Sequence, residues 1–169
     1  GLLDGVVISG GEPTLQPGLF AFCQKLKELG YAVKLDTNGT RPDVIRGLLR
    51  AGLVDYIAMD IKAALVDYSL FTPKDSVASK IQKSIQLIME FASAYEFRTT
   101  CIKPIINEAS VRSIAEMIEG AMLYALQRLR KTRVLRPDFF ENGRGTCEDS
   151  ELHHLRSIAL HFVKDCIIR

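Results

Sequence analysis

Three short stretches of the sequence combine glycine, carboxylate and ammonium groups in a pattern that suits a charged ligand. They are Ser9-Gly10-Gly11-Glu12-Pro13-Thr14, Leu35-Asp36-Thr37-Asn38-Gly39 and Ala58-Met59-Asp60-Ile61-Lys62. Two consecutive glycines let the backbone turn sharply and approach a ligand closely. The backbone groups beside Glu12 are then placed to hold an ammonium group.

Each stretch also has a plain structural interpretation when it is taken alone. The first is consistent with a simple strand-to-helix turn, since it is neither G-x-G-x-x-G nor a P-loop with its lysine. The second, alone, is better explained as an Asn-Gly turn capped by Asp36. In the third, Asp60 and Lys62 could form a structural ion pair with each other.

The spacing of the three stretches favours one shared site. Glu12 lies 24 residues before Asp36, and Asp36 lies 24 residues before Asp60. One strand–helix unit has about this length here, so we expect the three carboxylates at the same level of three successive strands. Ligands bind at the carboxyl ends of the strands in parallel α/β folds. The pattern therefore predicts one polar ledge at one mouth of a barrel.

Strand alternation predicts how the third stretch is oriented. Met59 and Ile61 are expected to face covering helices, whereas Asp60 and Lys62 face the opposite, inner side. A carboxylate and an ammonium group on the inner face of a buried strand are costly unless they are paired or bound to something. This cost favours a ligand at the ledge.

Strand-like and helix-like segments alternate along the whole chain. Strands are expected at 6–8, 31–35, 54–61, 96–103, 122–127 and 165–168, and a polar loop at 128–147. Helices are expected after Pro17 and Pro42 and along the apolar stripes that begin at Ile81, Val111 and Leu152. Repeated βα units imply a parallel sheet, and five or six strands are too few for a closed eightfold barrel. The sequence predicts an α/β fold, a partial (β/α) barrel forming a single domain over residues 1–169.

Composition and charge exclude several classes of protein. The 22 basic and 20 acidic residues leave a formal charge of +2, and the basic run from Arg128 to Arg136 is better explained as a solvated face than as a nucleic-acid site. There is no apolar run of about 18 residues for a membrane span and no signal-peptide pattern at the start. We expect a cytoplasmic protein that binds neither membrane nor nucleic acid.

The cysteines and histidines show no metal-binding pattern. The four cysteines are at least 19 residues apart, so no pair has zinc or cluster ligand spacing. We expect reduced, mostly buried cysteines. His153, His154 and His161 are expected on the surface of the last helix, since H-E-x-x-H is absent, and 141–145 is expected to be a solvated loop.

At the three stretches the sequence resembles the radical S-adenosylmethionine (SAM) enzymes. Gly10-Gly11-Glu12-Pro13 is similar to their GGEP motif, which binds the amino group of SAM. The pair Asp36-Thr37-Asn38-Gly39 and Met59-Asp60-Ile61-Lys62 resembles the glycyl-radical-enzyme activating enzymes. These include pyruvate formate-lyase activases and the activating proteins of anaerobic ribonucleotide reductase. Arg98-Thr99-Thr100 and Tyr124-Ala125-Leu126-Gln127 look closest to the latter type.

The resemblance implies a set of SAM-binding residues, namely Gly10, Gly11, Glu12, Pro13, Thr14, Asp36, Asn38, Asp60 and Lys62. Gly10, Gly11 and Glu12 would hold the SAM ammonium group. Lys62 would pair with the SAM carboxylate as a point charge. Asp36, Thr37 and Asp60 match residues that hold a monovalent cation in pyruvate formate-lyase activases, with a backbone carbonyl from Ala58.

The sequence departs from the family pattern in one serious respect. The C-x3-C-x2-C segment that binds the 4Fe–4S cluster lies upstream of GGEP in the family, and the four cysteines of this chain cannot replace it. We therefore expect a radical SAM core domain truncated at its N-terminus, with the first strand missing and no iron–sulfur ligands. In this form it should be inactive.

Three functions follow from this resemblance. The leading one is an activase that reductively cleaves SAM and generates a glycyl radical on a partner enzyme, with a flavodoxin-like or ferredoxin-like electron donor. The second is a radical SAM enzyme acting on a small molecule such as a deazapurine precursor. The third is a non-catalytic domain that binds SAM or a partner protein.

Overall fold

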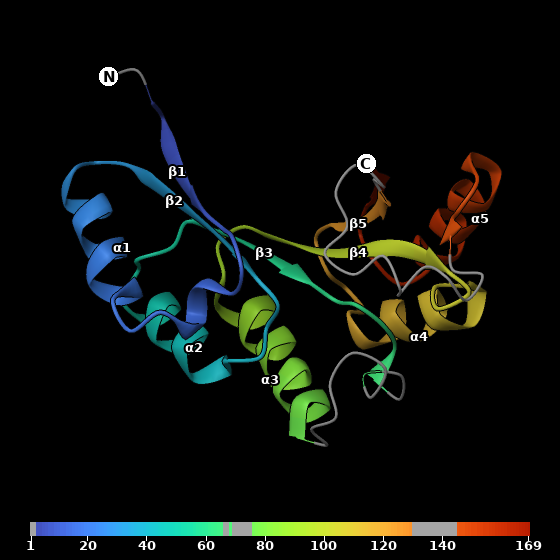
Figure 1. The fold of residues 1–169 in the computed structure, drawn as a ribbon, viewed down its shortest axis with the longest axis horizontal. Coiled ribbons are helices and arrows are strands. Elements are labelled where there is room, and N and C mark those ends of the chain that lie inside the picture. Colours follow the sequence, from blue (N-terminus) through green and yellow to red (C-terminus); the bar gives the residue numbers. More distant parts are fainter. Residues whose placement is uncertain (1–2, 66–67, 69–75, 130–144) are drawn as a thin grey trace. The chain divides into compact units, whose positions relative to one another are not determined.

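The computed structural model describes residues 3–65, 68, 76–129 and 145–169 (Figure 1). Its strands are β1 (Gly5–Ile8), β2 (Ala32–Thr37), β3 (Tyr56–Asp60), β4 (Tyr95–Lys103), β5 (Tyr124–Arg128), β6 (Gly145–Thr146) and β7 (Cys166–Ile168). Its helices are α1 (Leu19–Glu28), α2 (Pro42–Arg50), α3 (Ser76–Phe91), α4 (Glu108–Met117) and α5 (Asp149–Ala159), with the 3-10 helix η1 (Pro13–Leu15). Every strand and helix expected from the sequence is present.

The strand order is β1-β2-β3-β4-β5-β7, and the short β6 pairs with β4 in antiparallel fashion. The pairs β1–β2, β2–β3, β4–β5 and β5–β7 are parallel. Parallel neighbours need crossover connections, and the helices supply them. The predicted α/β class with an open parallel sheet is confirmed, with β1 and β7 at the two ends of the order of described strands.

The chain divides into two compact units. Unit 1 is Gly1–Asp60 with Lys74–Glu96, and unit 2 is Ile61–Pro73 with Phe97–Arg169. The boundary therefore falls within the third predicted motif, between Asp60 and Ile61. The single domain over residues 1–169 stays a prediction.

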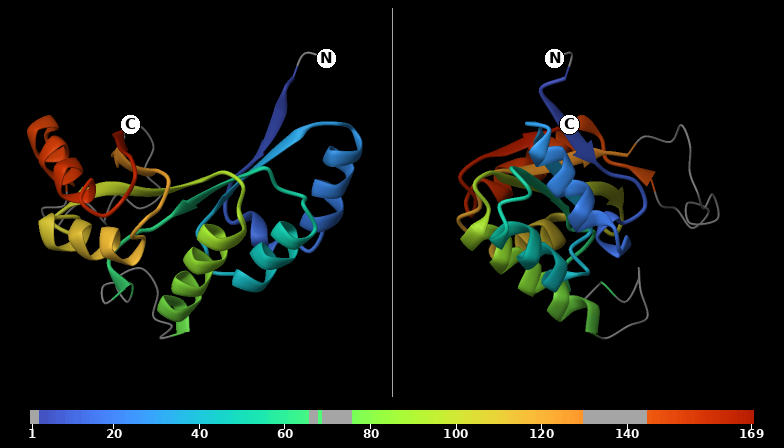
Figure 2. Two further views of the ribbon diagram at one scale, coloured as in Figure 1. Left: turned by 180° about the vertical axis from the view of Figure 1, so that it is seen from behind. Right: turned by 90° about the vertical axis from the view of Figure 1, so that its left-hand side faces the viewer.

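In unit 1, strand β2 alternates between a buried face and a polar face. Leu35 of β2 and Met59 of β3 are fully buried, and α1, α2 and α3 lie on this side of the three strands (Figures 1 and 2). Lys34 and Asp36 point the other way and are half-buried. Thr37 returns to the buried face at 3% exposure, as the alternation predicts.

Helix α1 buries a stripe that is shorter than expected. Leu19, Cys23 and Leu26 are buried, but Leu29 is 60% exposed. The helix ends at Glu28, and Leu29 is its C-cap residue, followed by Gly30 at φ 83°. The sequence spacing predicts an apolar stripe of Leu19, Cys23, Leu26 and Leu29. The stripe ends where the helix ends, so this prediction is wrong for Leu29.

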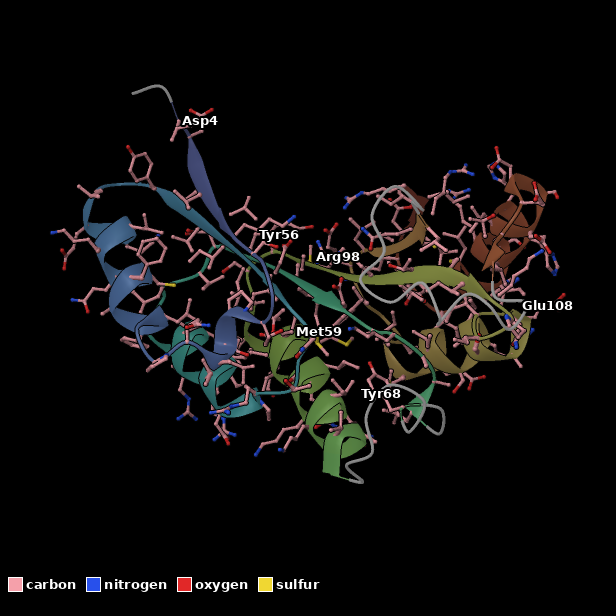
Figure 3. All side chains as sticks on the ribbon, in the orientation of Figure 1. Asp4, Tyr56, Met59, Tyr68, Arg98 and Glu108 are labelled. Atoms are coloured by element: carbon pink, nitrogen blue, oxygen red, sulfur yellow. The ribbon has the colours of Figure 1, made fainter. Side chains whose placement is uncertain are left out.

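A close contact fixes the loop after β2 against β3. Gly39 has φ 75°, and a β-carbon at this position would lie 2.1 Å from Met59 Cε and 3.4 Å from Ile81 Cδ1. Met59 points toward α3 in Figure 3, as predicted from strand alternation. The Ser84 hydroxyl on α3 donates to the Gly39 carbonyl at 2.7 Å. The positive φ angle favours glycine here, and a β-carbon would in addition displace the end of the Met59 side chain.

In unit 2 the core lies between β4, β5 and β7 and the two last helices. Phe97, Thr99 and Cys101 alternate inward along β4, and Tyr124 on β5 is fully buried. Helix α4 begins with a capping box, in which Asn107 Oδ1 accepts from the Ser110 N–H and Ser110 Oγ accepts from the Asn107 N–H. Helices α4 and α5 pack against each other.

Three other predictions from the sequence can be compared with the structure. The expected loop 128–147 contains β6, and residues 130–144, with most of the basic run, lie outside the described residues. His153, His154 and His161 are exposed, as predicted. No described helix is both long enough and apolar enough to cross a bilayer.

Candidate functional site

The turn after β1 is open toward its surroundings. Gly10 has φ 94° and Gly11 has φ 37°, and no atom lies within 4 Å of a β-carbon built on either residue. A pocket of about 370 Å³ adjoins the turn, lined also by Ser9, Gln16 and Phe22. The two glycines therefore leave open space beside the turn, and their role in ligand binding stays a prediction.

The Glu12 carboxylate locks this turn to the end of β2. Glu12 is only 9% exposed. Its Oε1 accepts from the Thr14 N–H at 3.1 Å, the Thr14 hydroxyl at 2.5 Å and the Thr37 hydroxyl at 2.7 Å. Its Oε2 accepts from the Asn38 N–H at 2.7 Å. Most of the hydrogen-bond acceptor positions of the carboxylate are thus occupied by donors of the same chain. Oε2 keeps an acceptor position that a ligand could use.

The register of the strands corrects the predicted ledge. Asp36 is level with Ala58, and Thr37 is level with Met59, so Asp60 lies two residues beyond the level of Asp36. The expectation that Asp36 and Asp60 share one level is wrong. Residues that are equally spaced in the sequence need not lie at the same level of the sheet, because the loops and helices of the two βα units differ in length.

Asp36 lies in a polar row on the face of unit 1 opposite the helices. The Ser9 hydroxyl donates to Asp36 Oδ2 at 3.3 Å, and Lys34 Nζ lies 3.8 Å from Asp36 Oδ1. Lys34 Nζ also lies 3.6 Å from Glu96 Oε1, whose side chain is 1% exposed, and 5.1 Å from the centre of the Tyr56 ring. Lys34 therefore compensates two carboxylates beside the turn.

The sequence reasoning missed Lys34 and Glu96 as part of this row. The available signal was the i, i+2 spacing of Lys34 and Asp36, which places both side chains on one face of β2. Glu96 had no such signal, because its proximity to Lys34 depends on strand pairing between residues 62 positions apart.

Asn38 and Thr37 shape the loop after β2. Asn38 Oδ1 accepts from the Thr40 N–H at 3.0 Å and from the Thr40 hydroxyl at 2.7 Å. Thr37 Oγ1 accepts from the Gly39 N–H at 3.2 Å. An Asn-Gly turn is therefore present, but the side chains that cap it in these hydrogen bonds are Thr37 and Asn38, whereas the plain alternative predicted capping by Asp36. The same loop also receives the Glu12 carboxylate.

Lys62 belongs to unit 2, two residues beyond the end of β3. Its side chain is exposed, and its backbone N–H donates to the Tyr68 hydroxyl at 3.1 Å. Asp60, the last residue of β3 in unit 1, is half-buried.

The cysteines do not form a metal centre. Cys23, Cys101 and Cys166 are buried, and Cys147 is half-buried. Burial raises the pKa of the Cys101 and Cys166 thiols to about 12, which disfavours the thiolate that a metal needs. Within the described ranges no three His, Cys, Asp or Glu side chains gather as metal ligands.

A pocket of about 540 Å³ in unit 2 lies between the end of β4 and helices α4 and α5. Its wall contains an ion pair of Lys103 with Glu151 at 2.5 Å. It also contains a contact at 3.0 Å between His154 Nε2 and Glu108 Oε1. Burial, followed by the charge of Glu151, raises the pKa of the Cys147 thiol in the same wall. The pocket therefore offers no activated nucleophile.

Comparisons with known proteins agree with the motifs. The family model described as "Radical SAM superfamily" matches residues 1–119. A "Putative glycyl-radical enzyme activating enzyme" of Methanocaldococcus jannaschii is 33% identical over 171 residues, covering 98% of this chain and 70% of that protein. A "7-carboxy-7-deazaguanine synthase" of Thermococcus kodakarensis is 43% identical over 130 residues, covering 75% of this chain and 49% of the relative.

Solved structures show the same fold. A domain of a pyruvate-formate lyase-activating enzyme from Bacteroides vulgatus matches with a TM-score of 0.73 at 16% identity, covering 98% of this chain and 99% of that one. A structure of TYW1 with a lysine-pyruvate adduct bound matches with a TM-score of 0.69 at 20% identity, covering 94% and 50%. These likenesses show the fold. The family match over residues 1–119, which is more than half of the chain, shows that the chain belongs to the radical SAM superfamily.

Proposed function

We propose that this protein binds SAM at the Gly10–Gly11 turn and that the whole protein is an activase, which generates a glycyl radical on a partner enzyme. The observation that carries the binding proposal is the Glu12 carboxylate, which holds the open glycine turn against the end of β2 through Thr37 and Asn38. These hydrogen bonds hold the turn in one conformation before a ligand binds.

The residues of the site suit the charges at the amino-acid end of SAM. The SAM ammonium group is a hydrogen-bond donor, and it would meet the backbone carbonyls of the turn and the remaining acceptor position of Glu12 Oε2. Asp36, Asn38 and Asp60, at the carboxyl ends of β2 and β3, and Pro13 and Thr14, next to Glu12 in the turn, are proposed to complete the ligand's surroundings. Lys62 is proposed to pair with the SAM carboxylate.

Membership of the superfamily implies SAM and a 4Fe–4S cluster as cofactors. The open turn fits the first of these, because no atom occupies the space that a β-carbon at Gly10 or Gly11 would face. The described cysteines do not fit the second, because three are buried and they do not gather. Reductive cleavage of SAM and hydrogen-atom abstraction from a glycine are the chemistry that the bound cofactors would supply.

A monovalent cation beside the site stays a proposal, with Asp36, Thr37 and Asp60 as its ligands. Asp36 and Asp60 would supply carboxylate oxygens. Thr37, whose hydroxyl donates to Glu12, would supply an oxygen atom. The carbonyl of Ala58, level with Asp36, would be a backbone ligand. Such a cation would offset the repulsion between the two carboxylates and the SAM carboxylate.

The activase branch is supported by the relative that covers almost the whole chain. That protein is named as a glycyl-radical enzyme activating enzyme, and 33% identity extends over 98% of this chain. We infer a glycyl radical enzyme as the partner, a flavodoxin-like or ferredoxin-like protein as the electron donor and the cytoplasm as the location.

The experiment is anaerobic incubation of the full gene product with SAM, a reductant and the glycyl radical enzyme of the same organism. We expect 5′-deoxyadenosine together with a glycyl-radical signal by electron paramagnetic resonance. Lys62→Ala should weaken SAM binding while cluster content stays the same. SAM cleavage without any glycyl radical would refute the activase, and unchanged SAM affinity in the variant would refute the role of Lys62.

A second candidate rests on the relative with the higher local identity. The Thermococcus kodakarensis protein is named as a 7-carboxy-7-deazaguanine synthase and is 43% identical over 130 residues. If this chain shared that activity, the full gene product would form 7-carboxy-7-deazaguanine and would not co-purify with a glycyl radical enzyme. Mass spectrometry of the products therefore separates the two candidates.

A further inference from the structure

The peptide unit between Ile61 and Lys62 is held at both of its polar atoms by side-chain hydroxyl groups. The Thr99 hydroxyl donates to the Ile61 carbonyl oxygen at 2.8 Å. The Lys62 N–H donates to the Tyr68 hydroxyl oxygen at 3.1 Å. All of these residues belong to unit 2. Because β3 ends at Asp60, this peptide lies just beyond the strand, where backbone pairing usually gives way to water.

Tyr124 fixes the direction of the first hydrogen bond. A carbonyl oxygen can only accept a hydrogen bond, so the Thr99 hydroxyl must donate its proton to the Ile61 carbonyl. The Tyr124 hydroxyl, 2.8 Å from Thr99 Oγ1, is therefore the donor to Thr99. Burial raises the pKa of Tyr124, so this donor stays protonated over the ordinary pH range. Hydrogen bonds in such a chain strengthen one another.

The three hydroxyl residues are almost inaccessible to water. Tyr124 is 0% exposed, Thr99 is 1% exposed and Tyr68, labelled in Figure 3, is 6% exposed. Thr99 lies on β4 and is level with Leu126 of β5, and the Ile61 N–H donates to the Arg98 carbonyl at 2.8 Å. The peptide is thus tied to the interior of unit 2, while the Lys62 side chain leaves toward solvent.

A fixed peptide of this kind restricts the root of the Lys62 side chain. It sets the ψ angle of Ile61 and the φ angle of Lys62, so the Cα–Cβ bond of Lys62 has one direction. The rest of the lysine side chain is flexible. The protein can therefore reduce the conformational-entropy cost of ligand binding in advance only by fixing the backbone of Lys62. We propose that Thr99, Tyr124 and Tyr68 are positioning residues that hold the backbone at Lys62, the residue proposed above to pair with the carboxylate of SAM, in one conformation. This inference rests on the role of Lys62 in the proposed function.

The hydrogen bonds from Thr99 to the Ile61 carbonyl and from the Lys62 N–H to Tyr68 are called the clamp below. The clamp is tested by amide hydrogen exchange of Lys62 in the full gene product. Tyr68→Phe removes the acceptor and should speed exchange of this amide at least about tenfold, because the protected N–H loses its partner. Exchange of the Val111 amide in α4 should stay the same. Unchanged exchange at Lys62 would overturn the clamp, whatever happens to SAM.

The effect on SAM is tested with matched side chains at position 99. Thr99→Val keeps the shape and removes the hydroxyl, and it should weaken equilibrium SAM binding by about five- to tenfold. Thr99→Ser keeps the hydroxyl and should return affinity to within about twofold of the parent. The kcat at saturating SAM should not change, because the clamp acts on binding.

Ser110→Ala supplies the control for a merely structural effect. It removes a buried hydroxyl from the α4 capping box in the same unit without touching Lys62, and it should leave SAM affinity unchanged. Equal weakening by Thr99→Val and Ser110→Ala, or no rescue by Thr99→Ser, would overturn the positioning role. If Lys62→Ala leaves SAM affinity intact, the proposed role of Lys62 in SAM binding and the proposed positioning of Lys62 are both refuted. The exchange experiment still shows whether the hydrogen bonds of the clamp exist.

Discussion

The Glu12 carboxylate and the Thr37 hydroxyl meet at 2.7 Å and join the turn after β1 to the last residue of β2. Both side chains are buried, at 9% and 3% exposure. The residue that the family motif marks as a ligand-binding glutamate is thus also an internal brace. The open part of the site is the glycine backbone that this brace holds in place.

Glu12→Gln should destabilise unit 1. The amide group offers only one acceptor oxygen, so at least one of the present donors loses its partner or faces an NH2 group. We expect the free energy of unfolding to fall by about 1–3 kcal/mol, measured by urea denaturation. Glu28→Gln, the same change at an exposed residue of α1, should cost less than about 0.5 kcal/mol. Equal losses in the two variants would argue against the brace.

Gly10→Ala should separate strain from ligand binding. Gly10 and Gly30 have similar φ angles, 94° and 83°, and no atom lies within 4 Å of a β-carbon at either position. Alanine at either site should therefore cost about 1–2 kcal/mol of stability for the left-handed backbone. Only Gly10→Ala should also weaken SAM binding, measured by calorimetry. If Gly30→Ala weakened binding as much, the turn would have no special part in the site.

Asp55 should contribute acid-sensitive stability to unit 1. Burial alone would raise its pKa, but hydrogen bonds from Lys27 Nζ at 2.7 Å and the Val33 N–H at 2.7 Å lower it below the ordinary value of 3.8. A carboxyl with a lowered folded-state pKa stabilises the fold above its unfolded-state pKa, and this stability is lost as pH falls through the folded value.

The measurement is urea denaturation at a series of pH values from about 6 down to about 2. The parent should lose stability relative to Asp55→Asn as the solution becomes more acidic, because the asparagine variant has no proton to bind. A stability difference that is independent of pH in this range would contradict the prediction.

The four cysteines should differ in reactivity toward an alkylating reagent. Burial raises the pKa of Cys101 and Cys166 to about 12, so little thiolate exists at pH 8 and access is blocked. Cys147 is the only one of the four that is not fully buried, and it should be labelled first in timed alkylation followed by mass spectrometry. Labelling of Cys101 at the rate of Cys147 in the folded protein would show that this part of the core is open.

The same cysteine environments predict the outcome of cluster reconstitution. Residues 1–169 incubated with iron and sulfide should show no 4Fe–4S absorbance, since cluster binding needs thiolates that lie close together. Stable cluster absorbance from this chain would mean that the four cysteines come together in a way their burial in the described residues does not indicate.

Much of the fold could be predicted from local patterns. Pro42 at the start of α2, Gly30 after α1 and the alternation of Leu35 and Thr37 with Asp36 each act within a few residues, so the sequence alone carries the information. The position of the site could be predicted too, because the glycine pair and the Asn38-Gly39 turn lie at strand ends. Lys34 and Glu96 show the limit, since their pairing joins distant strands.

The sequence by itself determined the class of fold, the order of its elements and the residue types at the candidate site. The tertiary structure decided the levels at which Asp36 and Asp60 lie and the partners of the Glu12 carboxylate. It also decided the hydroxyl groups that hold the peptide before Lys62. The physical reason is that hydrogen bonds and strand register depend on loop geometry and on side chains far apart in sequence, whereas strand alternation, helix stops and glycine turns depend on immediate neighbours.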